Sequence, residues 1–363
     1  MLSHSSAIRP PIAMLAELTH RCPLSCPYCS NPLELTAREA ELSASDWREV
    51  FAQAGALGVL QVHLSGGEPA ARRDLVELVA AAREAKLYTN LITSGVGLTR
   101  ERLGNLEGAG LDHVQLSLQG TDEEMADRIG GYKGGFGQKL RVAGWVAEIG
   151  LPLTLNVVVH RLNLHQVPDA IDMAVSMGAR RVEIAIVQFH GWALRNRAAL
   201  MPTREQAART WDIVEDARAR LKGVLVIDHV AADYHTEHPK RCMDGWGRTG
   251  FTVTPEGLVL PCHAAQTIPG MAFDSVRDRP LAEIWTEGHA FNAFRGDDWM
   301  REPCRSCERK GKDFGGCRCQ ALAMTGDARN ADPVCVKSPY HGVMRDQALG
   351  FSSSEGVDFL PRG

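Results

Sequence analysis

The chain has 363 residues, of which 44% are hydrophobic and 23% charged, and a formal net charge of −4 at pH 7. This length suits two domains, or one large barrel with an appended unit, and the apolar content is ample for a buried core. The small negative charge gives no reason to expect nucleic acid or an anionic membrane as a partner, and no apolar run approaches the ~18 residues that span a bilayer. Residues 1–11 do not form a secretion signal, so we expect a cytoplasmic protein in a reducing compartment.

Short apolar segments alternate with helical patterns through residues 11–222. The predicted strands are 12–18, 59–64, 88–93, 113–118, 152–159 and 181–187. Helical patterns cover 44–56, 74–85, 142–149, 167–177 and 204–219, and Ser43 followed by Asp46 is a helix-capping signal. Six βα repeats predict an α/β fold, a partial (β/α)6 TIM-like barrel, with a doubly wound parallel sheet as the alternative.

Three cysteines follow the first predicted strand in a C-x3-C-x2-C run: Cys22, Cys26 and Cys29. The loop is short, so the three thiols can converge on one centre. Three thiolates are one fewer than a closed zinc site or a fully ligated iron–sulfur cluster takes, which leaves one metal position open for chemistry. The alternative is a structural zinc loop with His20 as fourth ligand, although zinc sites more often come as paired units.

Polar segments, many of them glycine-rich, follow each predicted strand. In parallel βα architectures the chemistry lies at the carboxyl ends of the strands, so we expect these segments to share one rim. They are residues 22–29, 65–69, 93–95, 117–120, Asn156 with His160, and 188–192.

The cysteine run, with Tyr28 before its last thiol, resembles the signature of the radical S-adenosylmethionine (SAM) superfamily. The resemblance implies that Cys22, Cys26 and Cys29 hold a [4Fe–4S] cluster whose open iron is chelated by SAM. In that family the reduced cluster cleaves SAM to methionine and a 5′-deoxyadenosyl radical.

Other segments resemble SAM contacts of the same superfamily. Residues Gly66, Gly67, Glu68 and Pro69 resemble its glycine-rich motif, which binds the SAM amino group, although alone they would indicate an ordinary turn. Ser117 and Arg128 match, more weakly, positions that contact the SAM ribose and carboxylate. Thr93 and Asn156 are further candidates and could equally be rim residues satisfied within the protein, and Gln119 stands where the family often has Asp.

The other seven cysteines all lie between residues 242 and 335. In a reducing compartment this clustering argues for metal binding rather than for disulfides. Residues 251–254 and 258–260 flank a turn as a hairpin does, which brings Cys242 and Cys262 close together. Cys304-x2-Cys307 has the spacing of a metal knuckle, and a zinc ribbon is the alternative for this half taken alone.

The order Cys242-x14-Gly257-x4-Cys262 resembles the SPASM extension of radical SAM enzymes that act on peptides. The resemblance implies two auxiliary iron–sulfur clusters, either [2Fe–2S] or [4Fe–4S]. Asp313 stands where the pattern has a cysteine. A carboxylate can also hold iron, although a solvated acid beside Lys310 and Lys312 is the alternative. The family's ligand pattern implies Cys242, Cys262, Cys317 and Cys319 for auxiliary cluster I, and Cys304, Cys307, Asp313 and Cys335 for auxiliary cluster II.

Residues 188–197 resemble a Gly-Trp-Ala-x-x-Asn-Arg stretch of the peptide cyclases of pyrroloquinoline quinone (PQQ) biosynthesis, a likeness that extends over about residues 10–340. It implies hydrogen abstraction from the γ-carbon of a glutamate in the precursor peptide PqqA. The carbon radical then joins the ring of a nearby tyrosine, ortho to its hydroxyl. Candidates for positioning the peptide are Gln188, His190, Trp192 and Asn196; a structural Trp192 is an equal alternative, and no general base is assigned.

The expected organisation is a flexible N-terminus (1–10), a radical SAM core (11–222), a linker (223–241), a SPASM domain (242–340) and a flexible tail (341–363). No leader-peptide-binding domain is expected before the first strand. A separate carrier resembling the peptide chaperone PqqD, and a flavodoxin-type reductant, are therefore expected. The alternatives are another SPASM peptide modifier, such as a sulfatase maturase or a thioether-forming enzyme, or a non-catalytic iron–sulfur or zinc protein.

Overall fold

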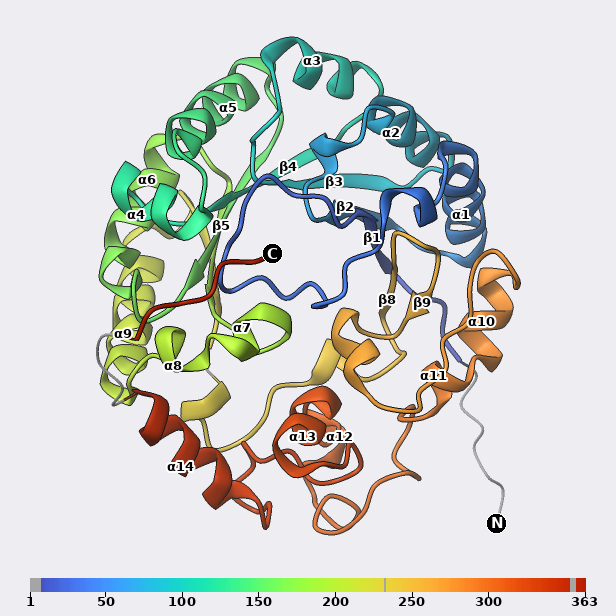
Figure 1. Ribbon diagram of the computed structural model, residues 1–363, viewed down its shortest axis with the longest axis vertical. Helices are drawn as coiled ribbons and strands as arrows, with labels where there is room; N and C mark the ends of the chain where they lie inside the picture. The colour runs from blue at the N-terminus through green and yellow to red at the C-terminus, as the bar shows by residue number, and fades with distance from the viewer. Residues whose placement is uncertain (1–7, 232, 353–356) are drawn as a thin grey trace.

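Figure 1 looks into the mouth of a curved parallel sheet with helices around its outside. The structure, a computed structural model, describes residues 8–231, 233–352 and 357–363. Seven strands pair in parallel in the order β7-β6-β5-β4-β3-β2-β1. The predicted partial barrel is confirmed. Its strands are β1 Ala13–Thr19, β2 Gln61–Gly66, β3 Tyr88–Thr93, β4 His113–Leu118, β5 Leu153–Val159, β6 Arg181–Ile186 and β7 Val226–Val230.

Helices cover the outer face of the sheet (Figure 1). Helix α1, Ala44–Leu57, begins at Ser43, whose hydroxyl accepts from the Asp46 N–H while the Asp46 carboxylate accepts from the Ser43 N–H. The fully buried rings of Trp47 and Phe51 on this helix join the main core, which fills the layer between helices and strands. The other covering helices are α2 Leu75–Glu84, α3 Arg100–Gly108, α4 Glu123–Gly130, α5 Gly135–Ile149, α6 Val167–Ser176 and α9 Arg204–Arg220.

The segment predicted as a linker, 223–241, contains the seventh strand of the barrel. Strand β7 pairs with β6 from Arg181 opposite Val226 to Ala185 opposite Val230. Ile227 is buried in the main core, and this burial holds the strand in the sheet. The linker prediction is therefore wrong for these five residues.

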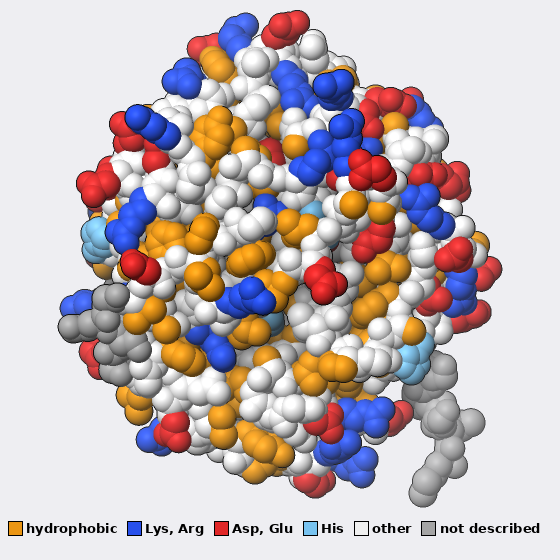
Figure 2. Space-filling model, in the orientation of Figure 1, with side chains coloured by type: hydrophobic (Ala, Val, Ile, Leu, Met, Phe, Trp, Pro, Cys, Tyr) orange, Lys and Arg blue, Asp and Glu red, His pale blue; other side chains and the backbone are white. Residues whose placement is uncertain are grey.

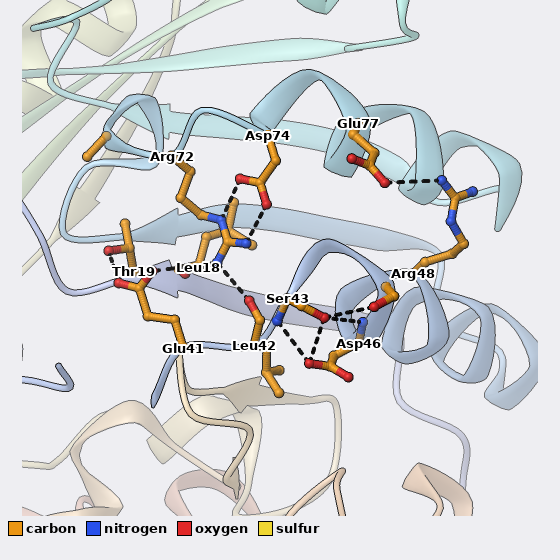
Figure 3. Close-up of polar contacts among 12 residues, drawn as sticks. Leu18, Thr19, Glu41, Leu42, Ser43, Asp46, Arg48, Arg72, Asp74 and Glu77 are labelled. Carbon is orange, nitrogen blue, oxygen red and sulfur yellow. Dashed lines mark hydrogen bonds and ion pairs between the residues drawn. The ribbon is translucent and has the colours of Figure 1, made fainter. Parts of the chain in front are cut away.

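A buried arginine fixes the end of β1, where the cysteine loop starts (Figure 3). The Nη1 atom of Arg72 donates to the carbonyl oxygens of Leu18 and Leu42, both at 3.0 Å. Its Nε and Nη2 atoms donate to the Asp74 carboxylate at 2.9 and 2.6 Å. Because Leu42 lies just before α1 and Asp74 just before α2, these bonds join the strand end to both helices.

The C-terminal unit, which corresponds to the predicted SPASM domain (242–340), continues the same sheet. Strands β8, Gly250–Val253, and β9, Val259–Leu260, form the predicted hairpin, and β8 pairs in parallel with β1. The unit's helices are α10 Leu281–Glu287, α11 His289–Asn292, α12 Lys310–Asp313 and α13 Arg318–Thr325. The pairing of β8 with β1 places this unit beside the strand that carries the cysteine loop.

The predicted flexible tail is wrong for residues 341–352 and 357–363. Helix α14, His341–Ser352, packs Met344 and Ala348 into a buried cluster with Leu200 and Val334. The segment 357–363 returns over the barrel mouth, where Arg362 is buried. Of the flexible N-terminus, residues 1–7 lie outside the described residues. The carbonyl of Arg9 accepts a hydrogen bond from the Trp285 indole at 2.9 Å.

Among the helices that the structure describes, none has the length and apolar character needed to cross a membrane.

Candidate active site at the barrel mouth

The three-cysteine loop follows β1 at the carboxyl ends of the strands, as expected. Burial raises the pKa of Cys22 to about 11 and that of Cys26 to about 12, and it also raises the pKa of Cys29. The thiols are therefore neutral at pH 7 in the metal-free protein. A metal that binds here must displace their protons.

A chain of polar side chains supports the loop from behind. Gln119 donates from Nε2 to the hydroxyl of Tyr28 at 2.9 Å, and that hydroxyl hydrogen-bonds to Cys26, which lowers the pKa of this thiol against the larger effect of burial. The Tyr28 ring packs against His160 with centroids 5.6 Å apart. Gln119, which departs from the family pattern, therefore acts through Tyr28 on one of the three thiols.

The two glycines of the predicted SAM turn bring it against the start of the cysteine loop. A Cβ on Gly66 would lie 2.3 Å from the carbonyl oxygen of Thr19, and one on Gly67 would lie 2.4 Å from that of Arg21. The amide N–H of Glu68 donates to the same Arg21 carbonyl at 2.8 Å. Only glycine permits this approach, so the turn and the loop form one surface.

The carboxylate of Glu68 is fully used within the protein. It accepts from the N–H of Ala70 at 2.9 Å, from the Thr93 hydroxyl at 2.7 Å, and from the N–H and hydroxyl of Ser94, both at 2.6 Å. Behind it, the Lys139 ammonium donates to the Ser94 carbonyl at 2.6 Å. Glu68 and Thr93 therefore tie the loops after β2 and β3 together, and Thr93 is a rim residue satisfied within the protein.

The other predicted SAM contacts differ in their placement. Ser117 on β4 lies opposite Asn156 on β5, which in turn lies opposite Glu183 on β6, so the three form one row across the sheet. Asn156 lines the central cavity, and its buried Oδ1 atom has no hydrogen-bond partner. Arg128 is exposed and lies over the ring of Phe359 at 5.8 Å, and it is not among the residues that line the cavity.

A cavity of about 500 Å³ lies between the barrel and the C-terminal unit. The barrel contributes Tyr28, Asn156 and Gln188 to its wall, and the C-terminal unit contributes Cys242 and other thiols. On the face seen in Figure 2, which has the orientation of Figure 1, hydrophobic side chains are mixed with Lys, Arg, Asp and Glu. The cavity is thus bounded by Tyr28 and Ser30, on either side of Cys29 in the loop, and by three thiols of the C-terminal unit.

Several buried polar atoms around the mouth have no hydrogen-bond partner within the described part of the chain. Such atoms are costly unless a ligand or water satisfies them. Together with three thiols that leave one metal position open, they fit an iron–sulfur cluster with a polar ligand such as SAM. These atoms are His20 Nε2, Asn31 Nδ2, Gln119 Oε1, Asn156 Oδ1, His160 Nε2, Trp192 Nε1 and Arg362 Nε.

The four predicted peptide-positioning residues separate into two pairs. Gln188 and His190 line the cavity. Burial lowers the pKa of His190, but its hydrogen bond to Cys317 and the charge of that thiol raise the pKa above its usual value. Trp192, on α7 Gly191–Arg195, donates its amide N–H to the Cys29 carbonyl at 2.9 Å. Asn196 is buried between the cysteine loop and the C-terminal segment, away from the cavity wall.

The four thiols predicted for auxiliary cluster I, Cys242, Cys262, Cys317 and Cys319, form a closed ring, called the thiol ring below. Cys242 hydrogen-bonds to both Cys262 and Cys317, and Cys319 hydrogen-bonds to the same two. These bonds hold the pKa values of Cys262 and Cys317 well below the usual value. The fold thus brings together four thiols that are up to 77 residues apart in the sequence, counting from 242 to 319.

The four residues predicted for auxiliary cluster II line a second, narrow cavity, and Asp332 lines both this cavity and the larger one. Asp313 is only 7% exposed, so the alternative of a solvated acid does not fit its surroundings. Burial raises the pKa of Cys304 to about 11. No three His, Cys, Asp or Glu side chains surround a single ion position within the described residues, and a cluster distributes its ligands over several iron atoms. The predicted ligands are Cys304, Cys307, Asp313 and Cys335.

Three charged residues of the site were not predicted from the sequence. Glu183 faces the cavity next to Asn156 in the sheet register, and strand alternation could have found it. Asp233, 3.2 Å from Lys240, lies in the segment expected to be a linker. Arg362 lies in the segment expected to be a flexible tail, and no sequence signal pointed to either of these two.

Two family profiles match the chain. The Radical SAM superfamily matches residues 16–174, and SPASM, an iron–sulfur cluster-binding domain, matches residues 242–308. Solved structures have the same fold. Streptococcus suis SuiB bound to S-adenosylmethionine has a TM-score of 0.75 at 20% identity, over 90% of this chain and 77% of that chain. The enzyme anSMEcpe with bound AdoMet has a TM-score of 0.62 at 15% identity, over 94% and 93%.

Curated relatives match almost the full length. The PqqA peptide cyclase of Rhizobium meliloti is 62% identical over 356 residues, which cover 98% of this chain and 95% of that protein. The PqqA peptide cyclase of Ruegeria pomeroyi is 58% identical over 353 residues, covering 97% and 94%. The radical SAM and SPASM resemblances are confirmed. The chain therefore belongs to the PqqA peptide cyclases, radical SAM enzymes with a SPASM domain that act in pyrroloquinoline quinone biosynthesis.

Proposed function

We propose that this enzyme joins the γ-carbon of a glutamate to the ring of a tyrosine in the precursor peptide PqqA, ortho to the tyrosine hydroxyl. The observation that carries the proposal is the cavity of about 500 Å³ between the three-cysteine loop and the thiol ring. In such a cavity one peptide segment can lie between a radical source and an electron acceptor. SuiB, solved with its precursor peptide SuiA, has a similar fold (TM-score 0.73, 19% identity, over 90% of this chain and 76% of that chain), which supports a peptide substrate.

The reaction balances as a loss of two hydrogens from the peptide. When bound, SAM and the reduced cluster supply a 5′-deoxyadenosyl radical, which takes one hydrogen atom from the glutamate γ-carbon. The carbon radical adds to the tyrosine ring, and rearomatisation releases one electron and one proton. The thiol ring is the proposed site of the electron acceptor. The cavity carboxylates Glu183 and Asp233, whose pKa values burial raises, are the proposed proton acceptors.

The proposed SAM site lies on the barrel side of the cavity. Cys22, Cys26 and Cys29 would hold a [4Fe–4S] cluster with one open iron. Asn156, with its unpartnered Oδ1, and the neighbouring Ser117 would face SAM. The turn at 66–69 would shape the site through its backbone, because the Glu68 carboxylate already has four donors.

Two auxiliary iron–sulfur clusters complete the proposed enzyme, one held by the thiol ring and one by the set that includes Asp313. The proposed radical SAM core extends through β7, and the SPASM domain covers 242–340. A chaperone of the PqqD type would present the peptide. A flavodoxin-type protein would supply the one electron that SAM cleavage needs.

The test uses anaerobically reconstituted enzyme with SAM, reductant, PqqA and PqqD. Peptide mass and fragmentation are read beside deoxyadenosine formation. The expected product has lost two hydrogens within one segment that carries a glutamate and a tyrosine, and the Cys29→Ala variant gives neither product. A new thioether or aldehyde, or deoxyadenosine with an unchanged peptide, would overturn the proposed cross-link.

A further inference from the structure

The C-terminal segment 357–363 lies across the barrel mouth against the cysteine loop (Figure 1). The amide N–H of Arg362 donates to the Ser25 carbonyl, between the first two thiols, at 3.0 Å. Asn196 hydrogen-bonds both backbone groups of Leu360. The segment is therefore fixed to the loop at two points, one backbone and one side chain.

The side chain of Arg362 is buried beside two of the three thiols, Cys22 and Cys29. Only 6% of the residue is exposed, and its Nη2 donates to the carbonyl of His20. Its charge lowers the pKa values of Cys22 and Cys29 against the larger effect of burial, so the guanidinium lies close enough to these sulfurs to interact with them.

This guanidinium has unused capacity to bind an anion. Its Nε atom is buried without a hydrogen-bond partner, and no carboxylate among the described residues forms an ion pair with it. A buried charge without a partner destabilises the folded protein. The burial of this charge beside Cys22 and Cys29 is explained if an anion binds to it.

Other cations near the mouth are already used. Arg128 is exposed over the Phe359 ring, and Lys139 donates to the Ser94 carbonyl. Of these three cations, Arg362 is the one whose side chain keeps a buried donor without a hydrogen-bond partner, and it comes from a segment that the sequence gave no reason to place there.

We propose that Arg362 is a positioning residue of the active site, which offers its Nε–H and positive charge to the anion bound at the cysteine loop. That anion is either the thiolate-ligated cluster or the carboxylate of SAM. The C-terminal segment is then part of the SAM site rather than a tail. The proposal rests on radical SAM chemistry and not on the Glu–Tyr cross-link, so the two can fail separately.

The test compares Arg362→Gln with Arg345→Gln, a matched change at an exposed position of α14. Iron content is measured first. The cluster at the three-cysteine loop is then identified as the one whose EPR signal changes when SAM is added, and its reduction potential is measured in the absence of SAM. The SAM dissociation constant is measured last, and none of these readouts needs peptide. Arg362→Gln is expected either to lower the potential by ~59 mV, the equivalent of a tenfold change for a one-electron couple, or to weaken SAM binding tenfold.

The two supporting results distinguish the two anions. A lowered potential identifies the cluster, because loss of a nearby cation disfavours the more negative reduced state. An unchanged potential with weakened SAM binding identifies the carboxylate. A potential and a SAM affinity equal to those of Arg345→Gln would overturn the proposal. If Arg362→Gln loads less iron than the control, Arg362→Lys replaces it, since it keeps the charge but loses the guanidinium donors. Fivefold weaker SAM binding by Arg362→Lys, or a potential that differs from that of Arg345→Gln, supports the proposal. A SAM affinity and a potential that both equal those of Arg345→Gln overturn it.

Discussion

Asn196 binds Leu360 twice, accepting from its N–H at 2.7 Å and donating to its carbonyl at 2.9 Å, although the two residues are 164 positions apart. The same Nδ2 group donates to the carbonyl of Pro27 at 2.9 Å, inside the cysteine loop. One buried amide thus joins the loop after β1, helix α8 (Arg197–Leu200), which starts at the next residue, and the C-terminal segment. Asn196, predicted to position the peptide, thus holds two segments of the site together; its role toward the peptide stays a prediction.

Replacement of Asn196 by alanine should release the C-terminal segment. Three hydrogen bonds are lost and buried backbone groups are left unpaired, which costs about 2–4 kcal/mol. We expect the amide protons of Leu360 and Arg362 to exchange with solvent at least tenfold faster. Asn105→Ala, at an exposed position of α3, is the control and should leave these rates unchanged. Equal protection in both variants would mean that Asn196 does not hold the segment.

The two auxiliary sites should lose iron independently. Cys319→Ala opens the thiol ring and should remove iron from auxiliary site I, whereas Asp313→Ala should remove it from site II. Iron analysis and EPR of the reduced proteins measure the two losses. The control Asp297→Ala removes an exposed carboxylate that is 2.8 Å from Lys310 and should keep the full iron content. Full iron and an unchanged spectrum in Asp313→Ala would exclude Asp313 as a ligand.

Glu68→Gln should destabilise the loops after β2 and β3. Four donors point at the Glu68 carboxylate, and the glutamine NH2 group cannot accept from any of them. Loss of charge-assisted bonds at a buried site costs about 3 kcal/mol, so the midpoint of thermal unfolding should fall by several degrees. Glu107→Gln, at an exposed position, should leave the midpoint unchanged. A midpoint equal to the control would show that the carboxylate charge is not needed there.

His160 should make the protein sensitive to acid. Burial lowers its pKa from 6.5 to about 3, so the neutral ring is favoured in the folded state. The stability that this contributes is fully present above pH 6.5 and is lost as the pH falls towards 3, by about 2 kcal/mol at pH 5.

The His160→Asn variant keeps an acceptor for the Leu162 N–H but cannot bind a proton in this range. Denaturant unfolding at pH 7 and pH 5 should show a smaller loss of stability in this variant than in the wild type. The control His289→Asn changes an exposed histidine and should behave like the wild type. An equal loss in all three proteins would contradict a buried neutral His160.

Patterns that depend on neighbouring residues were predictable from the sequence. The strands at 88–93 and 113–118 have the predicted bounds. In 113–118 the apolar Val114, Leu116 and Leu118 alternate with polar residues, and this period of two specifies a strand with one face in the core. Strand β7 was missed because Asp228 and His229 interrupt its apolar pattern, and only pairing with β6 gives this segment its place.

Contacts between distant segments were not predictable in the same way. The composition after residue 344 is typical of a mobile tail, yet Ala348 is buried and Arg362 lies beside the thiols. Local sequence carries no information about the Ser25 carbonyl that receives the Arg362 N–H. By contrast, the resemblance to the SPASM extension predicted that the four thiols of the thiol ring lie together. The fold does bring these same four together. Their role as iron ligands stays a prediction.

The most direct test of the proposed chemistry follows one hydrogen atom. PqqA carrying glutamate deuterated at the γ-carbon is incubated with the reconstituted enzyme, SAM, reductant and PqqD, and the deoxyadenosine is analysed by mass spectrometry. Direct abstraction from the γ-carbon predicts deoxyadenosine that is one mass unit heavier and a cross-linked peptide that has lost one deuterium. Unlabelled deoxyadenosine, formed together with a cross-linked peptide that keeps all its deuterium, would contradict abstraction at this carbon.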